Sequence, residues 1–535
     1  MTGPQHRLAE HLTLVGRLGA SAAELLCDRH PGDAVAFTVI EQDLTAHDLT
    51  FAELRDRSAR LATALAELGV RAGDRVATLM GKSAELVVAM LAILRLGAVY
   101  VPLFTAFAPA AIATRIGGNG TKVVITDGTQ RAKLAPSADL PPDPARQVVT
   151  TGPASAGELA YADLVTSPPQ TAAIAVGGDG TIVELFTSGA TGPPKAVPVP
   201  LRAVAAMAIY QEFGLDHQPA DVFWNAADPG WAYGLYQGLL GPLTLGRHGL
   251  LLRGGFSATL TWSVLTRFGV TNFTAGPTVY RSLRAAGSPI RRLRLRHCSS
   301  AGEPLDMATG RWAPDALGVP IRDHYGQTEL GMVTANAWHP DIRTDPPPGS
   351  MGPALPGWRL SVLRADTDDI ASAGSTGRLA VDIANSPLMW FQGYRHAPER
   401  SAERFTEDGR WYLTGDAATS DADGNFFFTA RDDDVILMAG YRIGPSEVEG
   451  VLLEHPYVAE AAVVGAPDEL RGEVLVAHVV LRPGARPSRN LFKELRDLVK
   501  TRLAAHLYPR AVYIVPALPK TPSGKIQRFA LRGKE

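Results

Sequence analysis

Nine residues in the first half of the chain combine the side chains and the backbone freedom that phosphate binding requires. The stretch reads Thr-Ser-Gly-Ala-Thr-Gly-Pro-Pro-Lys over residues 187–195 and directly follows a largely apolar run, Ile182 to Phe186. Glycines let backbone N–H groups approach phosphate oxygens, hydroxyls donate further hydrogen bonds, and a lysine supplies positive charge. An ordinary surface turn has a similar composition, so the stretch indicates phosphate binding only if the rest of the chain agrees.

Other common catalytic motifs are missing from the sequence. Lys195 follows a proline and precedes an alanine, whereas a Walker A loop requires Gly-Lys-Ser or Gly-Lys-Thr, and no Gly-x-Gly-x-x-Gly follows a predicted strand. There is no Gly-x-Ser-x-Gly for a serine nucleophile. Cys27 and Cys298 lack the paired spacing of a zinc site, so we expect neither a structural metal nor a disulfide framework.

Helix and strand signals place the phosphate-binding stretch in an α/β region. Thr50 and Glu53 have the spacing of a capping box, and leucines recur at helical period until Gly69, which predicts a helix over residues 51–68. Strands are predicted at residues 76–80, 98–101 and 122–126, and a second helix at 83–96. The alternation indicates mainly parallel sheets.

The same texture continues to about residue 432 and then changes. Further strands are predicted at residues 181–186, 250–252, 270–274, 295–299 and 320–325, and a Pro-rich loop at 344–350 leads into a β-rich segment. A short acidic run at residues 432–434 then precedes a strand at 435–438 and a helix from Pro445. We predict an α/β protein with a large N-terminal domain of layered α/β sheets plus a β-rich subdomain, residues 1–432, and a small mobile α+β C-terminal domain, residues 433–535.

The composition is that of a globular protein. The 535 residues are 46% hydrophobic and 20% charged, which is ordinary for a globular chain of more than one domain. The net charge of -2 gives no electrostatic reason to expect nucleic acid or an anionic membrane as a partner. The start of the chain has no apolar signal core, and the apolar stretch at residues 84–96 is too short to span a bilayer. We therefore expect a cytoplasmic protein without stable membrane insertion.

Six further motifs occur in an order that resembles a known superfamily. They are Ala-Gly-Glu-Pro at 301–304, Asp-His-Tyr-Gly-Gln-Thr-Glu at 323–329, Tyr-Leu-Thr-Gly-Asp at 412–416, Arg431 with Asp433 and Asp434, Gly-Tyr-Arg-Ile at 440–443, and Pro-Lys-Thr-Pro-Ser-Gly-Lys-Ile at 519–526. This set is similar to that of the adenylate-forming superfamily, which includes acyl-CoA synthetases, luciferases and nonribosomal peptide adenylation domains. Asp-Pro-Gly-Trp at 228–231 resembles the branch of acetyl-CoA and medium-chain acyl-CoA synthetases.

The resemblance implies an AMP-forming ligase that uses ATP, Mg2+ and coenzyme A. The phosphate-binding stretch would hold the β- and γ-phosphates, Asp416 would accept hydrogen bonds from the ribose hydroxyls, and Glu329 would bind the metal. Residues 302–304 and 323–325 would surround the adenine. The complete set implied for ATP and CoA is Thr187, Ser188, Gly189, Thr191, Gly192, Lys195, Gly302, Glu303, Pro304, Asp323, His324, Tyr325, Gly326, Gln327, Thr328, Asp416, Arg431, Gly440, Tyr441 and Arg442.

The C-terminal motifs imply that the small domain moves during the reaction. Lys525, with Glu329 and Thr187 as further catalytic residues, would contact the α-phosphate and the carboxylate while acyl-AMP forms. The domain would then rotate about Asp433, and residues 440–442 would line the pantetheine tunnel. Taken alone, Lys525 in a Pro/Gly/Ser-rich stretch would be an exposed surface lysine.

The acid is predicted from five residues that the resemblance places at the acyl pocket. These are Trp231, Ala232, Tyr233, Gly234 and Gly326. Acetate-specific relatives have a tryptophan at the position of Gly326, so its absence predicts room beyond acetate. We expect a short-to-medium-chain or branched carboxylic acid, with an aryl acid as the competing choice.

Two other functions fit parts of the pattern. The chain could transfer the acyl group to a carrier protein in place of CoA, or it could be a catalytically silent nucleotide-binding protein. A homo-oligomer is left open. Resemblance to acetyl-CoA synthetases also raises a lysine acetyltransferase or deacetylase acting on Lys525 as a partner.

Overall fold

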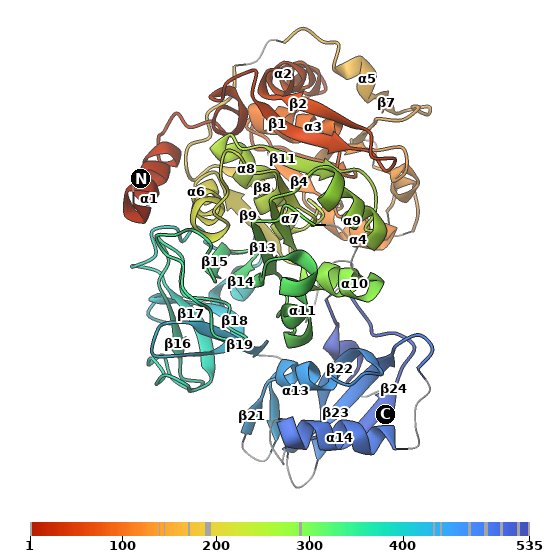
Figure 1. Ribbon diagram of the computed structural model, residues 1–535. Helices are drawn as coiled ribbons and strands as arrows, with labels where there is room; N and C mark the ends of the chain where they lie inside the picture. The colour runs from red at the N-terminus through yellow and green to blue at the C-terminus, as the bar shows by residue number, and fades with distance from the viewer. Residues whose placement is uncertain are drawn as a thin grey trace.

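The computed structural model describes residues 3–138, 140–143, 145–169, 172–187, 194–287, 292–431, 434–438, 441–468, 472–485, 490–502, 507–521 and 525–532. Within these residues the strands form four sheets, and Figure 1 shows that the last of them belongs to a C-terminal part set below the rest. The predicted α/β fold class is confirmed. The boundary between residues 432 and 433 stays a proposal.

The first sheet carries the strand that precedes the phosphate-binding stretch. Its order is β7 (Leu159–Ala160), β6 (Gln147–Thr150), β5 (Thr121–Thr126), β3 (Arg75–Leu79), β4 (Val99–Pro102), β8 (Thr181–Phe186) and β9 (Ala196–Pro200). The pairs are parallel except for β8 with β9, which is an antiparallel hairpin. The hairpin brings both ends of the phosphate-binding stretch to the same edge of the sheet.

The second sheet carries the predicted adenine and metal residues. Its order is β15 (Gly331–Ala335), β14 (Ile321–Gln327), β13 (His297–Ala301), β12 (Asn272–Ala275), β10 (Phe223–Asn225), β11 (Gly249–Leu252), β1 (Val35–Ile40) and β2 (Ala46–Thr50). Its inner strands are parallel, whereas β2 and β15 are antiparallel to their neighbours. Strand β13 begins two residues later than predicted and continues to Ala301, and within it Ser299 Oγ accepts from Trp338 Nε1 at 3.0 Å.

The predicted helices form with the expected caps. Helix α2 (Phe51–Glu67) has the capping box of Thr50 and Glu53, and Ser83 caps α3 (Ala84–Arg95). The other helices before residue 432 are α1 (Pro4–Val15), α4 (Pro109–Ile116), α5 (Tyr161–Leu164), α6 (Ala203–Ile209), α7 (Ala232–Leu235), α8 (Gly241–Leu245), α9 (Ala258–Arg267), α10 (Pro277–Ala286), α11 (Met307–Leu317) and α12 (Pro398–Ala402). A short 3-10 turn, η2, spans Arg131–Leu134. Helical turns with wider hydrogen-bond spacing, which the sequence did not predict, occur at η1 (Glu24–Asp28), η3 (Tyr210–Gly214) and η4 (Tyr236–Leu240).

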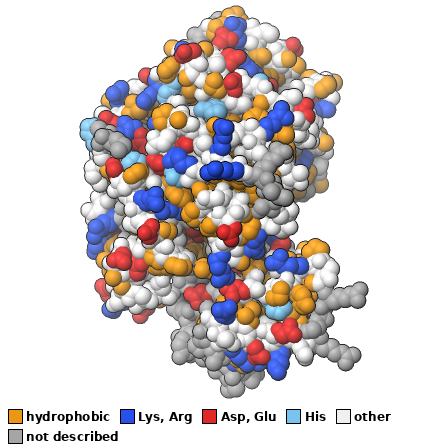
Figure 2. Space-filling view, viewed as in Figure 1, with side chains coloured by type: hydrophobic (Ala, Val, Ile, Leu, Met, Phe, Trp, Pro, Cys, Tyr) orange, Lys and Arg blue, Asp and Glu red, His pale blue; other side chains and the backbone are white. Residues whose placement is uncertain are grey.

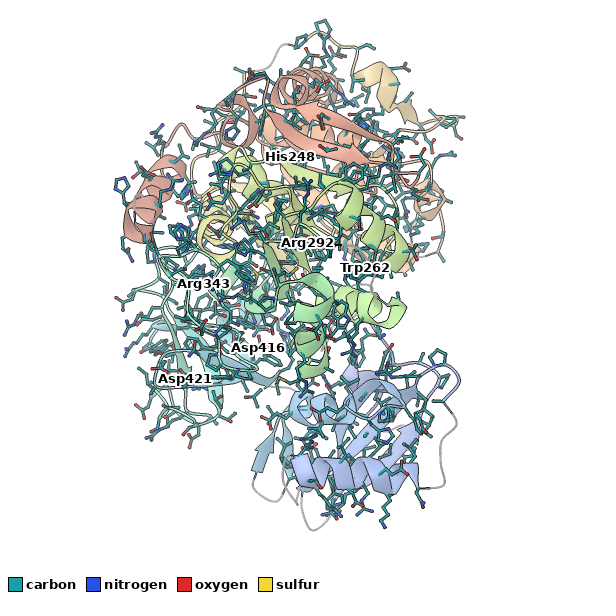
Figure 3. All side chains as sticks on the ribbon, viewed as in Figure 1. His248, Trp262, Arg292, Arg343, Asp416 and Asp421 are labelled. Atoms are coloured by element: carbon teal, nitrogen blue, oxygen red, sulfur yellow. The ribbon has the colours of Figure 1, made fainter. Side chains whose placement is uncertain are left out.

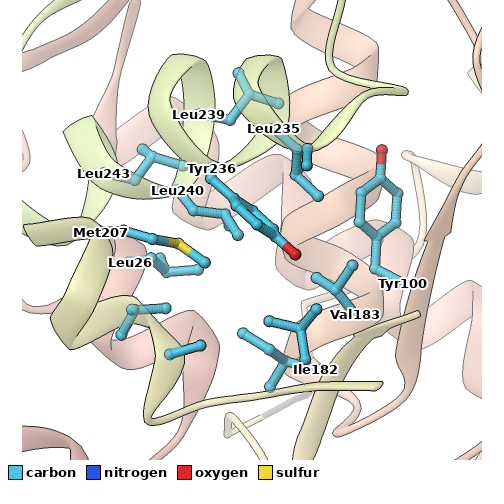
Figure 4. Close-up of a cluster of buried hydrophobic side chains, with 14 of the residues drawn as sticks. Leu26, Tyr100, Ile182, Val183, Met207, Leu235, Tyr236, Leu239, Leu240 and Leu243 are labelled. Atoms are coloured by element: carbon cyan, nitrogen blue, oxygen red, sulfur yellow. The ribbon is translucent and has the colours of Figure 1, made fainter. Parts of the chain in front are cut away.

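The main hydrophobic core joins the first sheet to helices of the second. Figure 4 shows Tyr100 and Val183 of the first sheet close to the side chains of Leu235, Tyr236 and Leu240. The Tyr236 hydroxyl donates to the Thr328 carbonyl at 2.9 Å. This core therefore supports the loop that carries the predicted metal ligand.

Two smaller sheets complete the fold. The third, β16 (Leu360–Leu363), β17 (Gly377–Asp382), β18 (Trp411–Ser420) and β19 (Phe426–Arg431), is antiparallel and confirms the predicted β-rich segment. The fourth contains β20 (Ile436–Met438), β21 (Tyr441–Ile443), β22 (Val458–Asp468), β23 (Gly472–Leu481) and β24 (Ala511–Ile514), with α13 (Pro445–Leu452), α14 (Leu491–Arg502) and the 3-10 turn η5 (Arg528–Ala530). Arg311 of α11 donates to Glu454 at 3.0 Å across the two parts. In the part of the chain that the structure describes, no helix has the length and apolar character to span a membrane.

Candidate active site

The ends of the phosphate-binding stretch are held together by the β8–β9 hairpin. The Thr187 amide donates to the Lys195 carbonyl at 2.9 Å, directly beyond the last strand pair. This bond holds the two described ends of the stretch, Thr187 and Lys195, together at the end of β8. Ser188, Gly189, Thr191 and Gly192 lie outside the described residues, so their phosphate contacts stay a prediction.

Lys195 and the predicted metal ligand meet at one tyrosine. The Lys195 Nζ lies 4.5 Å from the centre of the Tyr394 ring, and the Tyr394 hydroxyl donates to Glu329 Oε1 at 2.7 Å. Arg404 Nε donates to the same hydroxyl at 3.2 Å. Burial, followed by repulsion from Arg404, lowers the pKa of Lys195. Tyr394 thus connects the phosphate loop to the buried carboxylate of Glu329.

Asp416 is a buried acceptor on β18, and Figure 3 labels its position in the fold. Tyr325 donates its hydroxyl to Asp416 Oδ2, and Gln327 Nε2 donates to the same oxygen at 2.7 Å. Arg431 Nη1 lies 3.1 Å from Oδ1. These contacts bring β14, β18 and β19 together, so three of the predicted nucleotide-binding segments form one cluster.

Successive side chains of a strand point to opposite faces, so Asp323 and His324, two of the predicted adenine residues on β14, face opposite ways. Asp323 Oδ2 accepts from the Leu305 amide at 3.1 Å, and burial raises the pKa of this carboxyl to about 8. His324 faces the other way, where its Nδ1 lies 2.7 Å from the Tyr210 hydroxyl. Burial lowers the pKa of His324 to about 3, so its ring is neutral. The His324 side chain therefore packs against Tyr210 of η3, and its contact with a nucleotide stays a prediction.

Gly302 lets an indole ring lie against the backbone after β13. Its φ of +103° suits glycine, and a Cβ atom there would lie 2.6 Å from Cη2 of Trp231. The next residue, Glu303, accepts from Arg281 Nη2 at 3.1 Å and from the Thr278 hydroxyl at 2.6 Å, and it is followed by the exposed Pro304. The motif at 301–304 is thus placed beside the first residue of the predicted acyl pocket.

Lys525 reaches this site from the C-terminal part of the chain. Its Nζ lies 5.9 Å from the centre of the Trp231 ring, and the residue is half-buried, where an exposed lysine was predicted from a loop of this composition. Burial and repulsion from Arg431 lower its pKa, against attraction from Glu303, Asp416 and Glu329. The structure therefore brings Lys525 close to Trp231, whose ring lies against the predicted adenine residue Gly302.

The predicted acyl-pocket residues are only partly arranged as expected. Ala232 and Tyr233 are buried, and the Tyr233 hydroxyl lies 3.1 Å from that of Tyr210. Gly234 instead packs on backbone, because a Cβ there would lie 2.1 Å from the Asp228 carbonyl oxygen.

The expectation that Gly326 leaves open space needs correction. A Cβ atom at this position would lie 2.2 Å from the Gly331 carbonyl oxygen and 2.8 Å from Met332 Sδ. The strand register shifts between Tyr325 and Gly326, which presses β15 against the glycine. The space that a larger side chain would need is therefore filled by β15, and Met332 is a further candidate for this wall.

The predicted hinge and pantetheine residues cannot be placed in full. Asp433 and Gly440 lie outside the described residues. The backbones of Tyr441 and Arg442 form β21, which pairs with β20, while their side chains also lie outside what the structure describes. Their roles stay predictions.

Sequence reasoning missed Tyr394, Arg404 and Tyr210. Two of them contact a partner far away in the chain, since Tyr394 lies 65 positions from Glu329 and Tyr210 lies 114 from His324. Arg404 contacts Tyr394, which lies 10 positions away. In the sequence, Tyr394 is preceded by Gly393, and the structure shows that this glycine has a φ of +147°. A single Gly-Tyr pair is too common to indicate a site.

Comparison with known proteins agrees with this arrangement. The AMP-binding enzyme family matches residues 24–394, and the AMP-binding enzyme C-terminal domain matches residues 447–525. The chain belongs to the AMP-binding enzyme family. The acetyl-coenzyme A synthetase of Bacillus subtilis (strain 168) is 34% identical over 502 residues, covering 91% of this chain and 85% of that protein.

Solved structures of the family superpose on nearly the whole chain. The Brucella canis acyl-CoA synthetase has a TM-score of 0.76 at 43% identity, covering 98% of this chain and 96% of that one. The anthranilate CoA ligase AuaEII, in complex with anthranoyl-AMP, has a TM-score of 0.85 at 28% identity, covering 96% and 97%. The predicted membership of the adenylate-forming acyl-CoA synthetase family is confirmed, and with it the prediction of an AMP-forming ligase.

Proposed function

We propose that this member of the AMP-binding enzyme family activates a carboxylic acid with ATP and transfers the acyl group to coenzyme A. The first half-reaction gives acyl-AMP and pyrophosphate, and the second gives an acyl-CoA thioester and AMP. The observation that carries the proposal is the position of Lys525 beside Trp231, within the electrostatic reach of Asp416, Glu329 and Arg431.

Each residue around Lys525 has chemistry suited to acyl-AMP formation. Asp416 is already an acceptor for hydroxyl and amide donors, so the two ribose hydroxyls are suitable partners. The aromatic ring of Tyr325 offers a surface for the adenine. The ammonium group of Lys525 would offset the negative charge that develops at the α-phosphorus as the carboxylate attacks.

Glu329 fits a role as a ligand of Mg2+ shared with ATP. Tyr394 donates to its Oε1, and among the described residues no hydrogen bond to Oε2 competes with a cation. The described residues contain no group of three or more His, Cys, Asp or Glu that could hold a metal ion by themselves. A hard oxygen ligand that shares Mg2+ with phosphate oxygens matches this donor set, and the ion would supply positive charge next to the phosphates.

For the acid we propose a short-to-medium-chain or branched aliphatic acid. The predicted walls are Trp231, whose ring centre lies 5.9 Å from Lys525 Nζ, and the buried Ala232 and Tyr233 that follow it in the chain. The competing aryl acid is supported by the likeness to the anthranilate CoA ligase, and aromatic walls would suit it as well. A panel of acids assayed for pyrophosphate release, with and without CoA, separates these choices.

The acyl acceptor in this proposal is coenzyme A. Similarity to acyl-CoA synthetases over more than nine-tenths of the chain supports CoA. A carrier protein is the alternative, and comparison of CoA with a phosphopantetheinylated carrier in one assay decides between them. A catalytically silent protein would bind ATP and release no pyrophosphate with any acid.

The role of Lys525 is tested by separating the two half-reactions. Lys525→Ala should strongly reduce acyl-AMP formation and leave thioester formation from supplied acyl-AMP close to normal. Lys520→Ala is a matched control, because this lysine lies in the same segment and pairs with Glu460 at 2.7 Å. Equal loss in both half-reactions for Lys525→Ala would show that the assigned role is wrong.

A further inference from the structure

A network of buried charges crosses the C-terminal part of the chain behind Lys525. Arg528 in η5 donates Nε and Nη2 to the two oxygens of Glu449 at 2.9 and 2.7 Å, and Nη1 to Asp434 Oδ2 at 3.2 Å. Arg532 Nη2 lies 3.1 Å from Asp434 Oδ1. Two guanidinium groups thus neutralise two carboxylates, and the pair of parallel bonds to Glu449 fixes the orientation of Arg528.

The network connects segments that matter for the position of Lys525. Asp434 follows the predicted hinge residue Asp433 directly, and Arg528 follows Lys525 by three positions. Glu449 lies on α13 and also accepts the Val463 amide of β22 at 2.8 Å. One arginine therefore ties the chain just after the hinge, the helix and the sheet to the end of the Lys525 loop.

Several contacts hold the Lys525 loop to the sheet of the C-terminal part. Lys520 pairs with Glu460 of β22 at 2.7 Å, and Ile526 packs against the buried cluster that contains Leu518. The Thr521 amide donates to the Lys525 carbonyl at 2.7 Å, and the Lys525 amide donates to the Thr521 hydroxyl at 3.1 Å. Arg528 adds the contact to Asp434, next to the predicted hinge residue. Arg528 is 16% exposed at its side chain, and Glu449 and Asp434 are 9% and 12% exposed, so water screens the network only weakly.

We propose that Arg528 is a positioning residue that fixes the Lys525 loop to the segment after the hinge, so that rotation of the small domain delivers Lys525 to the acyl-AMP site. This inference rests on the proposed function of Lys525. In the thioester-forming arrangement Lys525 is not needed, so the network should matter for the first half-reaction and not for the second.

The test compares variants of Arg528 in the two half-reactions of the full-length enzyme. For Arg528→Gln we expect the kcat of pyrophosphate release to fall by roughly 10- to 100-fold, since a displacement of about 1 Å at a reacting group can cost on the order of 100-fold. Thioester formation from supplied acyl-AMP should change by less than about 2-fold, and the KM for ATP should stay similar. Arg528→Lys should behave like Arg528→Gln, because a lysine cannot form the paired bonds to Glu449.

Two further variants keep the test decisive. Arg532→Gln removes one exposed contact to Asp434 and should cost less than about 3-fold in the first half-reaction. If Arg528→Gln does not accumulate as folded protein, Glu449→Gln keeps an acceptor for the Val463 amide and should show the same selective loss.

The results separate failure of this inference from failure of the proposed function. If Lys525→Ala abolishes acyl-AMP formation and Arg528→Gln leaves it intact, Arg528 does not position the loop. If Arg528→Gln lowers both half-reactions equally together with the melting temperature, the network only stabilises the small domain and the inference is wrong. If Lys525→Ala itself leaves acyl-AMP formation intact, the proposed role of Lys525 fails.

Discussion

Removal of one hydroxyl group, in Tyr394→Phe, should impair acyl-AMP formation selectively. The hydroxyl donates to Glu329 Oε1 at 2.7 Å and accepts from Arg404 Nε at 3.2 Å. Phenylalanine keeps the ring under Lys195 and the packing of the site. It leaves the buried Glu329 carboxylate without its phenol donor, so the carboxylate is free to turn away from the phosphates.

The expected size of the effect follows from the charge on Glu329. A hydrogen bond to a charged group contributes about 1.5–3 kcal/mol, which corresponds to roughly 10- to 150-fold in rate. Tyr412→Phe is a matched control, because its hydroxyl donates to the neutral amide oxygen of Gln327 at 3.2 Å. A bond between neutral groups contributes about 0.5–1.5 kcal/mol, so the control should lose only roughly 2- to 12-fold.

The assay is pyrophosphate release at saturating ATP and acid over a range of Mg2+ concentrations. We expect Tyr394→Phe to lower the maximal rate and to raise the Mg2+ concentration needed for half of it, with thioester formation from supplied acyl-AMP unchanged. A Tyr394→Phe enzyme that matches the wild type at every Mg2+ concentration would refute the role of Tyr394 in orienting Glu329.

Three other substitutions test the packing and electrostatics around the site. Burial lowers the pKa of His324 to about 3 in the folded protein, so below about pH 6.5 the unfolded chain binds a proton that the folded protein does not, and acidification should lower the free energy of unfolding. The midpoint of urea denaturation should fall less steeply with decreasing pH in His324→Gln than in the wild type. Gly326→Ala should lower the free energy of unfolding by about 1–3 kcal/mol by pushing β15, measured by urea denaturation, and an unchanged value would contradict the Gly331 contact. Glu184→Gln should lower the free energy of unfolding by about 3 kcal/mol in the same measurement, because Arg75 and Arg395 would lose the charge of a fully buried partner. As a control, Asp179→Asn removes the charge from an exposed ion pair and should cost less than about 1 kcal/mol.

Local signals predicted the elements of the fold well. The capping box at Thr50 and Glu53 forms as its spacing indicates, and the apolar runs before the phosphate-binding stretch become β4 and β8 of a mainly parallel sheet. Strand β13 lies two residues further along the chain than predicted, and its buried Ser299 is satisfied by a tryptophan 39 positions away. Such a partner is visible only after the chain has folded.

Residues from separate predicted motifs lie together in the structure, while their roles toward a nucleotide stay predictions. Asp416 and Tyr325 come from separate motifs and do form a hydrogen bond. The sequence could not predict which face of β14 each residue would occupy, and the contact between the His324 ring and Tyr210 of η3 is visible only in the structure. The expectation for Gly326 failed for a similar reason, since the shift in register that brings β15 against it is a property of the pairing and not of the glycine.

The charges around Lys525 bear on the proposed movement of the small domain. Glu303, Asp416 and Glu329 attract its ammonium group, and yet burial and Arg431 leave its pKa lowered. The attraction from the protein alone therefore does not compensate the ammonium group for the loss of water. In the proposed reaction, the phosphates of ATP and the carboxylate of the acid supply the missing negative charge, so their binding favours the inserted lysine. In this proposal, departure of pyrophosphate removes most of that charge and weakens the hold on Lys525 before the proposed rotation of the small domain.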